Sequence, residues 1–197
     1  LVMHQLAETH RTGQLQTYHS DRPVASGQVR RFESRYVPLE GGRTLALVRD
    51  VTETHLLEQR FRTMADGTPI GIFTTDAKGL CDYTNPAWQA LYGLTAEESL
   101  GTGWARTLLP EDRSAVYTGW QRSMETRQPF EMEFRVQPPG GPVRRVWAQA
   151  QPILRPDGSV RAHVGAVVDV TQAHELAEAR QAQAVAEESG RRQRAFL

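Results

Sequence analysis

The fold is decided by residues 141–171, which read GPVRRVWAQAQPILRPDGSVRAHVGAVVDVT. An earlier segment, residues 27–52, repeats them as GQVRRFESRYVPLEGGRTLALVRDVT, and both copies end in Asp-Val-Thr. The copies begin 114 residues apart and end 119 residues apart, so the second copy carries five extra residues. These extra residues fall around Arg155-Pro156-Asp157-Gly158, a sequence that predicts a turn, and insertions within repeats usually fall in loops.

Each copy predicts two strands joined by a hairpin and followed by a helix. The strands of the first copy are expected at Val29–Pro38 and Thr44–Asp50, and those of the second at Val143–Leu154 and Val160–Val168. Residues 160–168 are apolar almost throughout, which predicts a central strand covered on both faces. The first sheet has only three expected strands and a helix tail, so we expect its inner face to be uncovered.

Between the copies, the sequence predicts two strands, short helices, one long helix and a further strand. Asn85-Pro86-Ala87 is typical of a helix start, because asparagine caps free amides and proline fits the first helical position. The remaining elements are expected at Ile70–Thr75, Leu80–Thr84, a capping box at Thr95–Glu98, a long helix from Pro110 to Thr126, and an alternating strand at Glu131–Val136. This order predicts an α+β domain with an antiparallel sheet.

Composition excludes several classes of protein. The 197 residues carry 23 basic and 23 acidic side chains, so there is no basic excess of the kind that marks a nucleic-acid partner. Cys81 is the single cysteine and cannot form an internal disulfide, which indicates a cytoplasmic location. No apolar run reaches the roughly 18 residues of a membrane span. We expect the chain to be a piece of a longer protein, whose membrane anchor, if it has one, lies upstream.

Taken in order, these motifs resemble PAS domains with their PAC tail. The resemblance covers about residues 68–171, and residues 14–52 resemble the second half of another such domain. It implies a five-stranded antiparallel sheet with helices on one face around a small pocket. The expected division is a truncated PAS domain (1–52), a linker helix (53–66), a complete PAS domain (67–171) and an output helix with coiled-coil character (172–197).

The resemblance also implies that the repeated Asp-Val-Thr is a signal junction between the last strand and the output helix. It assigns this role to Asp169 and Thr171, and upstream to Asp50 and Thr52. Their chemistry is suitable, because threonine can cap a helix and aspartate can accept charge-assisted hydrogen bonds. The alternative is that these residues only cap a helix. His55 and His174 each follow the threonine by three residues, and we expect a surface role for both.

The end of the chain, residues 191–197, resembles the segment that leads into the dimerisation helix of sensor histidine kinases. This implies a homodimer formed through the flanking helices and a kinase domain farther along the same chain. The expected helical seam has small and polar residues at heptad spacing, which favours a weak and switchable coiled coil. Its members are Leu176, Ala179, Gln183 and Ala186.

The residues give little support for a cofactor or for catalysis. Flavin-binding relatives need a cysteine where residues 101–108 carry Trp104, and haem-binding relatives need a histidine that residues 110–127 lack. We expect no cofactor, no metal and no catalytic residue, and an unknown small ligand is left open. Side chains that could line a pocket, or alternatively only fill the core, are Phe73, Tyr83, Tyr92, Trp104, Trp120, Phe134 and Trp147, with Arg135 and Gln149 as polar contacts.

The sequence therefore predicts the sensory and relay module of a two-component sensor histidine kinase, with the catalytic part outside these residues. Two alternatives stay open. The module belongs instead to a cyclic-dinucleotide signalling protein such as a diguanylate cyclase, or it is a sensor that binds flavin or haem through an unusual site.

Overall fold

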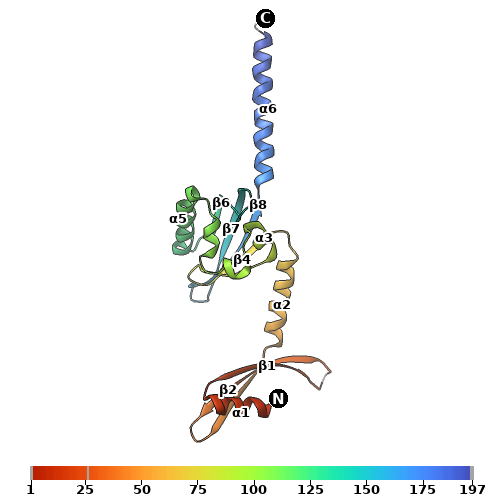
Figure 1. The fold of residues 1–197 in the computed structure, drawn as a ribbon, viewed down its shortest axis with the longest axis vertical. Helices are drawn as coiled ribbons and strands as arrows, with labels where there is room; N and C mark the ends of the chain where they lie inside the picture. Colours follow the sequence, from red (N-terminus) through yellow and green to blue (C-terminus); the bar gives the residue numbers. More distant parts are fainter. Residues whose placement is uncertain (1, 26, 196–197) are drawn as a thin grey trace. The chain divides into compact units, whose positions relative to one another are not determined.

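A computed structural model describes residues 2–25 and 27–195 of the chain (Figure 1). It divides into two compact units, Leu1–Met64 and Ala65–Leu197. Each unit has its own antiparallel sheet, of three strands in the first and five in the second. We describe the second unit first, because it holds the larger core.

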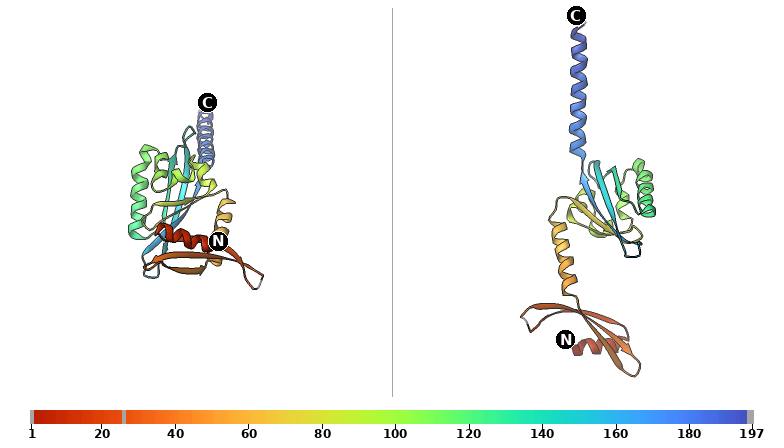
Figure 2. Two further views of the ribbon diagram at one scale, coloured as in Figure 1. Left: turned by 60° about the horizontal axis from the view of Figure 1, so that its bottom comes forward. Right: turned by 180° about the vertical axis from the view of Figure 1, so that it is seen from behind.

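The five strands of the second unit lie in the order β5-β4-β8-β7-β6. Their bounds are β4 (Gly71–Thr75), β5 (Cys81–Thr84), β6 (Phe130–Val136), β7 (Arg144–Leu154) and β8 (Val160–Asp169). Between β5 and β6 come α3 (Pro86–Tyr92), α4 (Ala96–Ser99), η1 (Gly103–Thr107) and α5 (Pro110–Thr126), and α6 (Thr171–Ala195) follows β8. The helices between β5 and β6 lie on one face of the sheet (Figure 2). The predicted fold class, an α+β fold with a five-stranded antiparallel sheet and helices on one face, is confirmed.

Strand β8 occupies the middle of the sheet, as its apolar sequence predicts. The expectation that both of its faces are covered is wrong. Burial alternates along the strand, so that His163, Gly165 and Val167 are buried while Val164 and its alternate neighbours are only half-buried. The reason is that the helices of this unit cover the inner face alone.

Local capping explains where the helices of the second unit begin. The Asn85 side chain accepts a hydrogen bond from the Trp88 amide at 2.9 Å, and Pro86 occupies the first turn of α3. Thr95 and Glu98 form the predicted capping box at the start of α4. Since these residues satisfy amides that a helix start leaves unpaired, each fixes the point at which the chain turns from strand or loop to helix.

The first unit contains α1 (Val2–Thr12), β1 (Gln16–Pro23), β2 (Val29–Leu39), β3 (Arg43–Asp50) and α2 (Thr52–Asp66), whose last two residues belong to the second unit. Its sheet has the order β1-β2-β3. Helix α1 contacts β2 and β3 and buries Tyr36 and Ser34, which corrects the expectation of an uncovered inner face. Large apolar side chains on β3, among them Leu47 and Val48, remain exposed.

The order α1-β1-β2-β3-α2 repeats the order α5-β6-β7-β8-α6 with the same register. Phe32 pairs with Asp50 in the first unit, and Val146 pairs with Asp169 in the second. These pairs keep the offsets of 114 and 119 seen in the sequence. The helices before the strands follow the offset of 114 too, because α1 ends at Thr12 and α5 at Thr126.

The five extra residues of the second copy lie at the tip of its hairpin. Leu39 pairs with Arg43 across the short turn of the first unit, and the equivalent pair in the second unit is Ile153 with Ala162. The insertion lengthens the loop beyond this pair. It therefore leaves the far end of the strands, where the Asp-Val-Thr segments lie, in the same register in both units.

Candidate functional site

In the second unit, Asp-Val-Thr ties three elements together at the end of β8. The Thr171 hydroxyl accepts a hydrogen bond from the Arg145 amide of β7 at 2.9 Å. The Thr171 amide donates to Asp169 Oδ1 at 3.0 Å, and the Val170 amide donates to the Arg145 carbonyl at 2.9 Å. The first residue of α6 is thus fastened to a neighbouring strand as well as to the strand that it follows. We call this arrangement the second junction.

The first unit contains the same bonds, which we call the first junction. The Thr52 hydroxyl accepts from the Arg31 amide at 2.8 Å, the Thr52 amide donates to Asp50 Oδ1 at 3.0 Å, and the Val51 amide donates to the Arg31 carbonyl at 2.8 Å. Hydrogen bonds from the Thr52 hydroxyl and amide hold the pKa of Asp50 below its usual value. The two junctions therefore share three bonds, including one to a neighbouring strand that a simple helix cap does not require, and the first junction adds a bond from the Thr52 hydroxyl to Asp50 at 2.6 Å.

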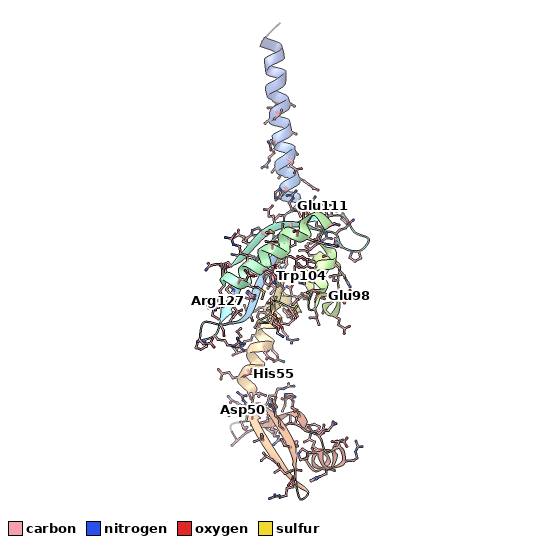
Figure 3. The ribbon with its side chains drawn as sticks, turned by 90° about the vertical axis from the view of Figure 1, so that its left-hand side faces the viewer. Asp50, His55, Glu98, Trp104, Glu111 and Arg127 are labelled. Carbon is pink, nitrogen blue, oxygen red and sulfur yellow. The ribbon has the colours of Figure 1, made fainter. Side chains whose placement is uncertain are left out.

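The junctions differ in the histidine that follows. His174 Nε2 lies 2.9 Å from Glu133 Oε2, so α6 is also held to β6. His55 Nε2 lies 3.0 Å from a guanidinium nitrogen of Arg31, and His55 must accept this bond because arginine only donates. Figure 3 shows His55 near the start of α2, close to Asp50. Both histidines are partly exposed, and the sequence did not indicate their partners.

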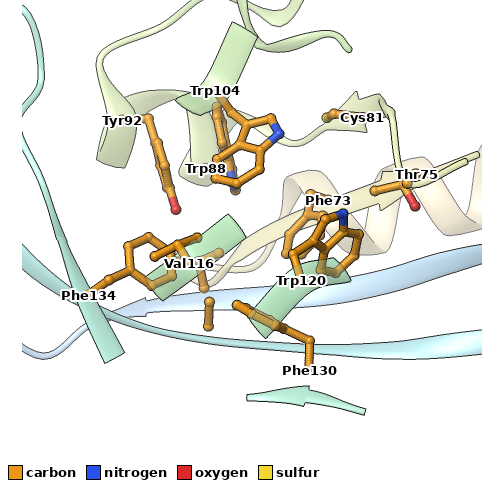
Figure 4. A pocket seen from close by; sticks show the side chains of 13 residues that line it. Phe73, Thr75, Cys81, Trp88, Tyr92, Trp104, Val116, Trp120, Phe130 and Phe134 are labelled. Atoms are coloured by element: carbon orange, nitrogen blue, oxygen red, sulfur yellow. The ribbon is translucent and has the colours of Figure 1, made fainter. Parts of the chain in front are cut away.

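The second unit also has a cavity of about 40 Å³ between its helices and the inner face of its sheet (Figure 4). Its lining is mostly aromatic and apolar. The lining residues are Phe73, Thr75, Gly79, Cys81, Trp88, Tyr92, Trp104, Val116, Trp120, Phe130, Phe134, Ala148 and Val167. The volume corresponds to about three water molecules at roughly 10–15 Å³ each.

Five of the nine predicted pocket residues line this cavity. They are Phe73, Tyr92, Trp104, Trp120 and Phe134. Phe73 reaches the cavity across Gly165, where an added Cβ would collide with the Phe73 ring. The structure thus brings these five side chains together around one cavity.

The other four predicted residues lie elsewhere. On β7 the buried positions are Val146, Ala148 and Ala150, so Trp147 and Gln149 point to the opposite face of the sheet. The Trp147 indole donates to Glu131 at 3.3 Å on that face. The size of Trp147 suggested a core position, but strand alternation excludes it once Ala148 faces inward.

Arg135 and Tyr83 are also outside the cavity. Arg135 donates from two side-chain nitrogens to the Asp112 carboxylate, at 3.0 and 2.7 Å, and these bonds hold the pKa of Asp112 below its usual value. This pair joins β6 to the start of α5. The Tyr83 hydroxyl donates to Asp66 at 3.1 Å, at the end of α2. Neither side chain is available as a polar contact for a ligand in the cavity.

His163 is a buried polar residue that the sequence reasoning did not single out. Its Nδ1 lies 3.3 Å from the Thr75 hydroxyl, which donates to the Asp76 carbonyl at 3.1 Å. Nδ1 is therefore the donor, and Nε2 is an acceptor with no partner among the described residues. Burial lowers the pKa of His163. The alternation His163-x-Gly165-x-Val167 along β8 shows in the sequence that these residues share one face of the strand, but not that this face is the buried one.

Cys81 lines the cavity, and burial raises the pKa of its thiol to about 11. A flavin or haem site generally needs several hundred Å³, which the cavity of about 40 Å³ does not provide in this conformation.

Among the described residues, no group of three or more His, Cys, Asp or Glu side chains is placed to hold a metal ion. Within the same residues, no helix has the length and apolar character needed to cross a membrane.

Comparison with known proteins supports the fold assignment. Residues 82–167 match the family model of the PAS fold. The chain superposes on the PAS domain of a protein from Colwellia psychrerythraea with a TM-score of 0.52 and 21% identity, over 59% of this chain and 98% of that one. The second unit is therefore a PAS-fold domain.

Two curated relatives match parts of the sequence. The uncharacterized protein y4lL of Sinorhizobium fredii (strain NBRC 101917 / NGR234) is 36% identical over 115 residues, which are 58% of this chain and 14% of y4lL. The probable diguanylate cyclase DgcE of Escherichia coli (strain K12) is 34% identical over 76 residues, which are 39% of this chain and 7% of DgcE. The matched segments are thus small parts of much longer proteins.

Proposed function

We propose that this chain is a sensory and relay module, in which the PAS-fold domain responds to a bound ligand or partner and the junction passes the response to α6. The observation that carries the proposal is the duplicated junction. Bonds of the same kind, with nearly the same lengths, fasten the helix to the sheet after Asp50 and again after Asp169. A device used twice, each time between a sheet and a departing helix, suits transmission.

Only a short segment of β7 separates the cavity from the backbone groups that hold α6. Ala148 lines the cavity, and Arg145 lies three residues before it on the same strand. The backbone of Arg145 makes both contacts to the second junction, donating to Thr171 and accepting from Val170. A shift of β7 caused by a ligand would therefore move the groups that hold the first turn of α6. By this argument, α6 is the output helix.

The flanking helices are the proposed dimer contacts. Leu176 and Ala179 of the expected seam are exposed, as are the polar residues around them. Exposed apolar residues at heptad spacing on a long helix suit a partner helix, and a second copy of the chain is the simplest partner. The Phe196-Leu197 pair that suggested a following kinase segment lies outside the described residues.

The output domain of the parent protein remains a choice between two classes. The resemblance of residues 191–197 to the region before a phosphoacceptor helix supports a sensor histidine kinase. The similarity to 7% of a probable diguanylate cyclase supports the cyclic-dinucleotide class. We propose the kinase, with a cytoplasmic sensor region, and the motif that follows residue 197 in the parent protein decides between the two.

The relay can be tested on the chain itself by filling the cavity. Ala148→Val adds two carbon atoms to the cavity wall, and we expect it to change the amide hydrogen exchange of residues 171–180. Thr171→Val removes the junction hydroxyl with little change in shape. If the junction carries the response, the double variant should no longer show the effect of Ala148→Val on α6. An unchanged response in the double variant would refute the relay.

A further inference from the structure

The polarity of the cavity limits what it can bind. Among the described residues, no charged side chain lines it, and the Thr75 hydroxyl is already bonded to Asp76 and His163. A charged ligand would lose its hydration without gaining an opposite charge, which is very unfavourable in an apolar site. Organic acids, amines and phosphates are therefore poor occupants, and the ligand must be neutral.

Four polar side-chain groups of the lining make no hydrogen bond to the described residues, namely the Tyr92 hydroxyl and the indole N–H groups of Trp88, Trp104 and Trp120. Of these four, only the hydroxyl can both donate and accept. The Tyr92 hydroxyl has no hydrogen-bond partner among the described residues, and Figure 4 shows it turned inward among the lining side chains. The Tyr92 ring is stacked on Trp88, with centroids 3.9 Å apart and planes 9° from parallel, so its position is fixed by packing. Burial raises the pKa of Tyr92, and the hydroxyl is thus a neutral donor and acceptor. It can orient a ligand that carries one hydroxyl, carbonyl or nitrile group.

The size of the cavity sets the second limit. A space of about 40 Å³ holds roughly three water molecules, and a dry cavity that admits benzene is near 150 Å³. Without movement of the tryptophans, an aromatic ring does not fit. A molecule with about four non-hydrogen atoms is the largest that the space accepts.

We infer that the cavity binds a small neutral organic molecule of about four non-hydrogen atoms, of the short-chain alcohol, ketone or nitrile class, with its polar atom on the Tyr92 hydroxyl. This inference rests on the proposed sensory function in one respect, namely that the molecule bound in this cavity is the signal. The best ligand efficiencies limit so small a molecule to a Kd no tighter than roughly tens of micromolar. The sensor would thus respond to micromolar or millimolar concentrations.

The test uses 1-propanol as the probe and the four tryptophan indoles as reporters. Trp88, Trp104 and Trp120 line the cavity, and Trp147 lies on the opposite face of the sheet as an internal control. Titration of the whole chain, followed by NMR of the indole N–H groups, should show saturable shifts at the lining tryptophans and none at Trp147. Acetate, which has the same number of non-hydrogen atoms but carries a charge, should produce no such shifts.

Two variants test separately the role of the Tyr92 hydroxyl and the role of the empty space in the cavity. Tyr92→Phe keeps the stacked ring and should weaken 1-propanol binding about 5- to 10-fold, the usual value of one hydrogen bond, while leaving binding of xenon unchanged. Ala148→Val should abolish binding of both probes. Equal shifts at Trp147, binding of acetate, tighter binding of phenol, or an unaltered 1-propanol affinity in Tyr92→Phe would each overturn the inference.

The relay and the ligand class can fail separately. If 1-propanol does not bind, while Ala148→Val still alters exchange in α6 through Thr171, the ligand inference is wrong and the relay stands. If 1-propanol binds as described but α6 does not respond to Ala148→Val, the ligand inference stands and the relay is wrong.

Discussion

Replacing Asn85 should cost the PAS-fold domain much of its stability, because this fully buried side chain makes four hydrogen bonds. Its oxygen accepts from the amides of Ile72 and Trp88, at 2.8 and 2.9 Å. Its nitrogen donates to the carbonyls of Ala65 and Ile70, at 2.7 and 2.9 Å. Asn85 therefore joins the end of α2, strand β4 and the start of α3.

Asn85→Ala removes all four bonds and leaves four backbone groups without these partners. At about 1 kcal/mol for each bond, we expect the free energy of unfolding to fall by about 3–4 kcal/mol. Asn85→Asp keeps the two accepted bonds but places an oxygen against the carbonyls of Ala65 and Ile70. It should cost about 3 kcal/mol or more, because a buried carboxylate then faces two acceptors.

The assay is a urea titration followed by tryptophan fluorescence. All four tryptophans lie in the second unit, so the signal reports that unit alone. Thr95→Ala, which removes an exposed capping box, is the control and should cost about 1 kcal/mol. Asparagine and aspartate are equally good helix caps. A stability of Asn85→Asp within about 1 kcal/mol of the natural sequence would show that Asn85 acts only as a cap, which would refute the reasoning.

Three further predictions concern titratable groups. Asp112→Asn should lower the free energy of unfolding by about 1–2 kcal/mol at neutral pH, because it weakens the bonds to Arg135. The pKa of Asp112 is lowered in the fold, so this difference in stability from the natural sequence should shrink as the pH falls below 3.8. The pKa of His163 is lowered in the fold, so the contribution of neutral His163 to stability is complete above its usual pKa of 6.5 and is lost as the pH falls below 6.5. Urea titrations at pH 7.5 and pH 5 should show this loss of stability. An equal loss in His163→Phe would contradict the prediction. Cys81, whose pKa is about 11, should react slowly with iodoacetamide at pH 7.5 and much faster in urea, and fast reaction without urea would contradict its burial.

The sequence predicted features that depend on local chemistry. Asn85-Pro86 and Thr95–Glu98 begin helices where expected, because caps need only residues a few positions apart. The repeat also predicted two strands joined by a hairpin and followed by a helix in each copy, and both units contain them. Central placement of β8 followed from its apolar composition, but the prediction that its outer face is covered was wrong, since that face is only half-buried and its burial depends on which side of the sheet the helices cover.

The candidate site was predicted less well, because the pocket depends on which face of a strand turns inward. Trp147 has the size of a core residue, yet Ala148 beside it faces the cavity and sets the opposite alternation. Arg135 was expected to contact a ligand, but Asp112 from α5 lies close enough to pair with it. His163 was missed for the same reason, since only the packed helices show that its side of β8 is the buried one.

The duplicated junction is tested most directly by the exchange of two amides, those of Arg31 and Arg145. Each donates to a threonine hydroxyl, Thr52 in the first unit and Thr171 in the second. We predict that Thr52→Val speeds exchange of the Arg31 amide, and Thr171→Val that of the Arg145 amide and of the first turn of α6, about 5- to 10-fold in each case. Gln172→Ala, at an exposed neighbouring position, should leave both amides unchanged. Unaltered exchange at both arginines in the two threonine variants would contradict the claim that these hydroxyls fasten the helices to the sheets.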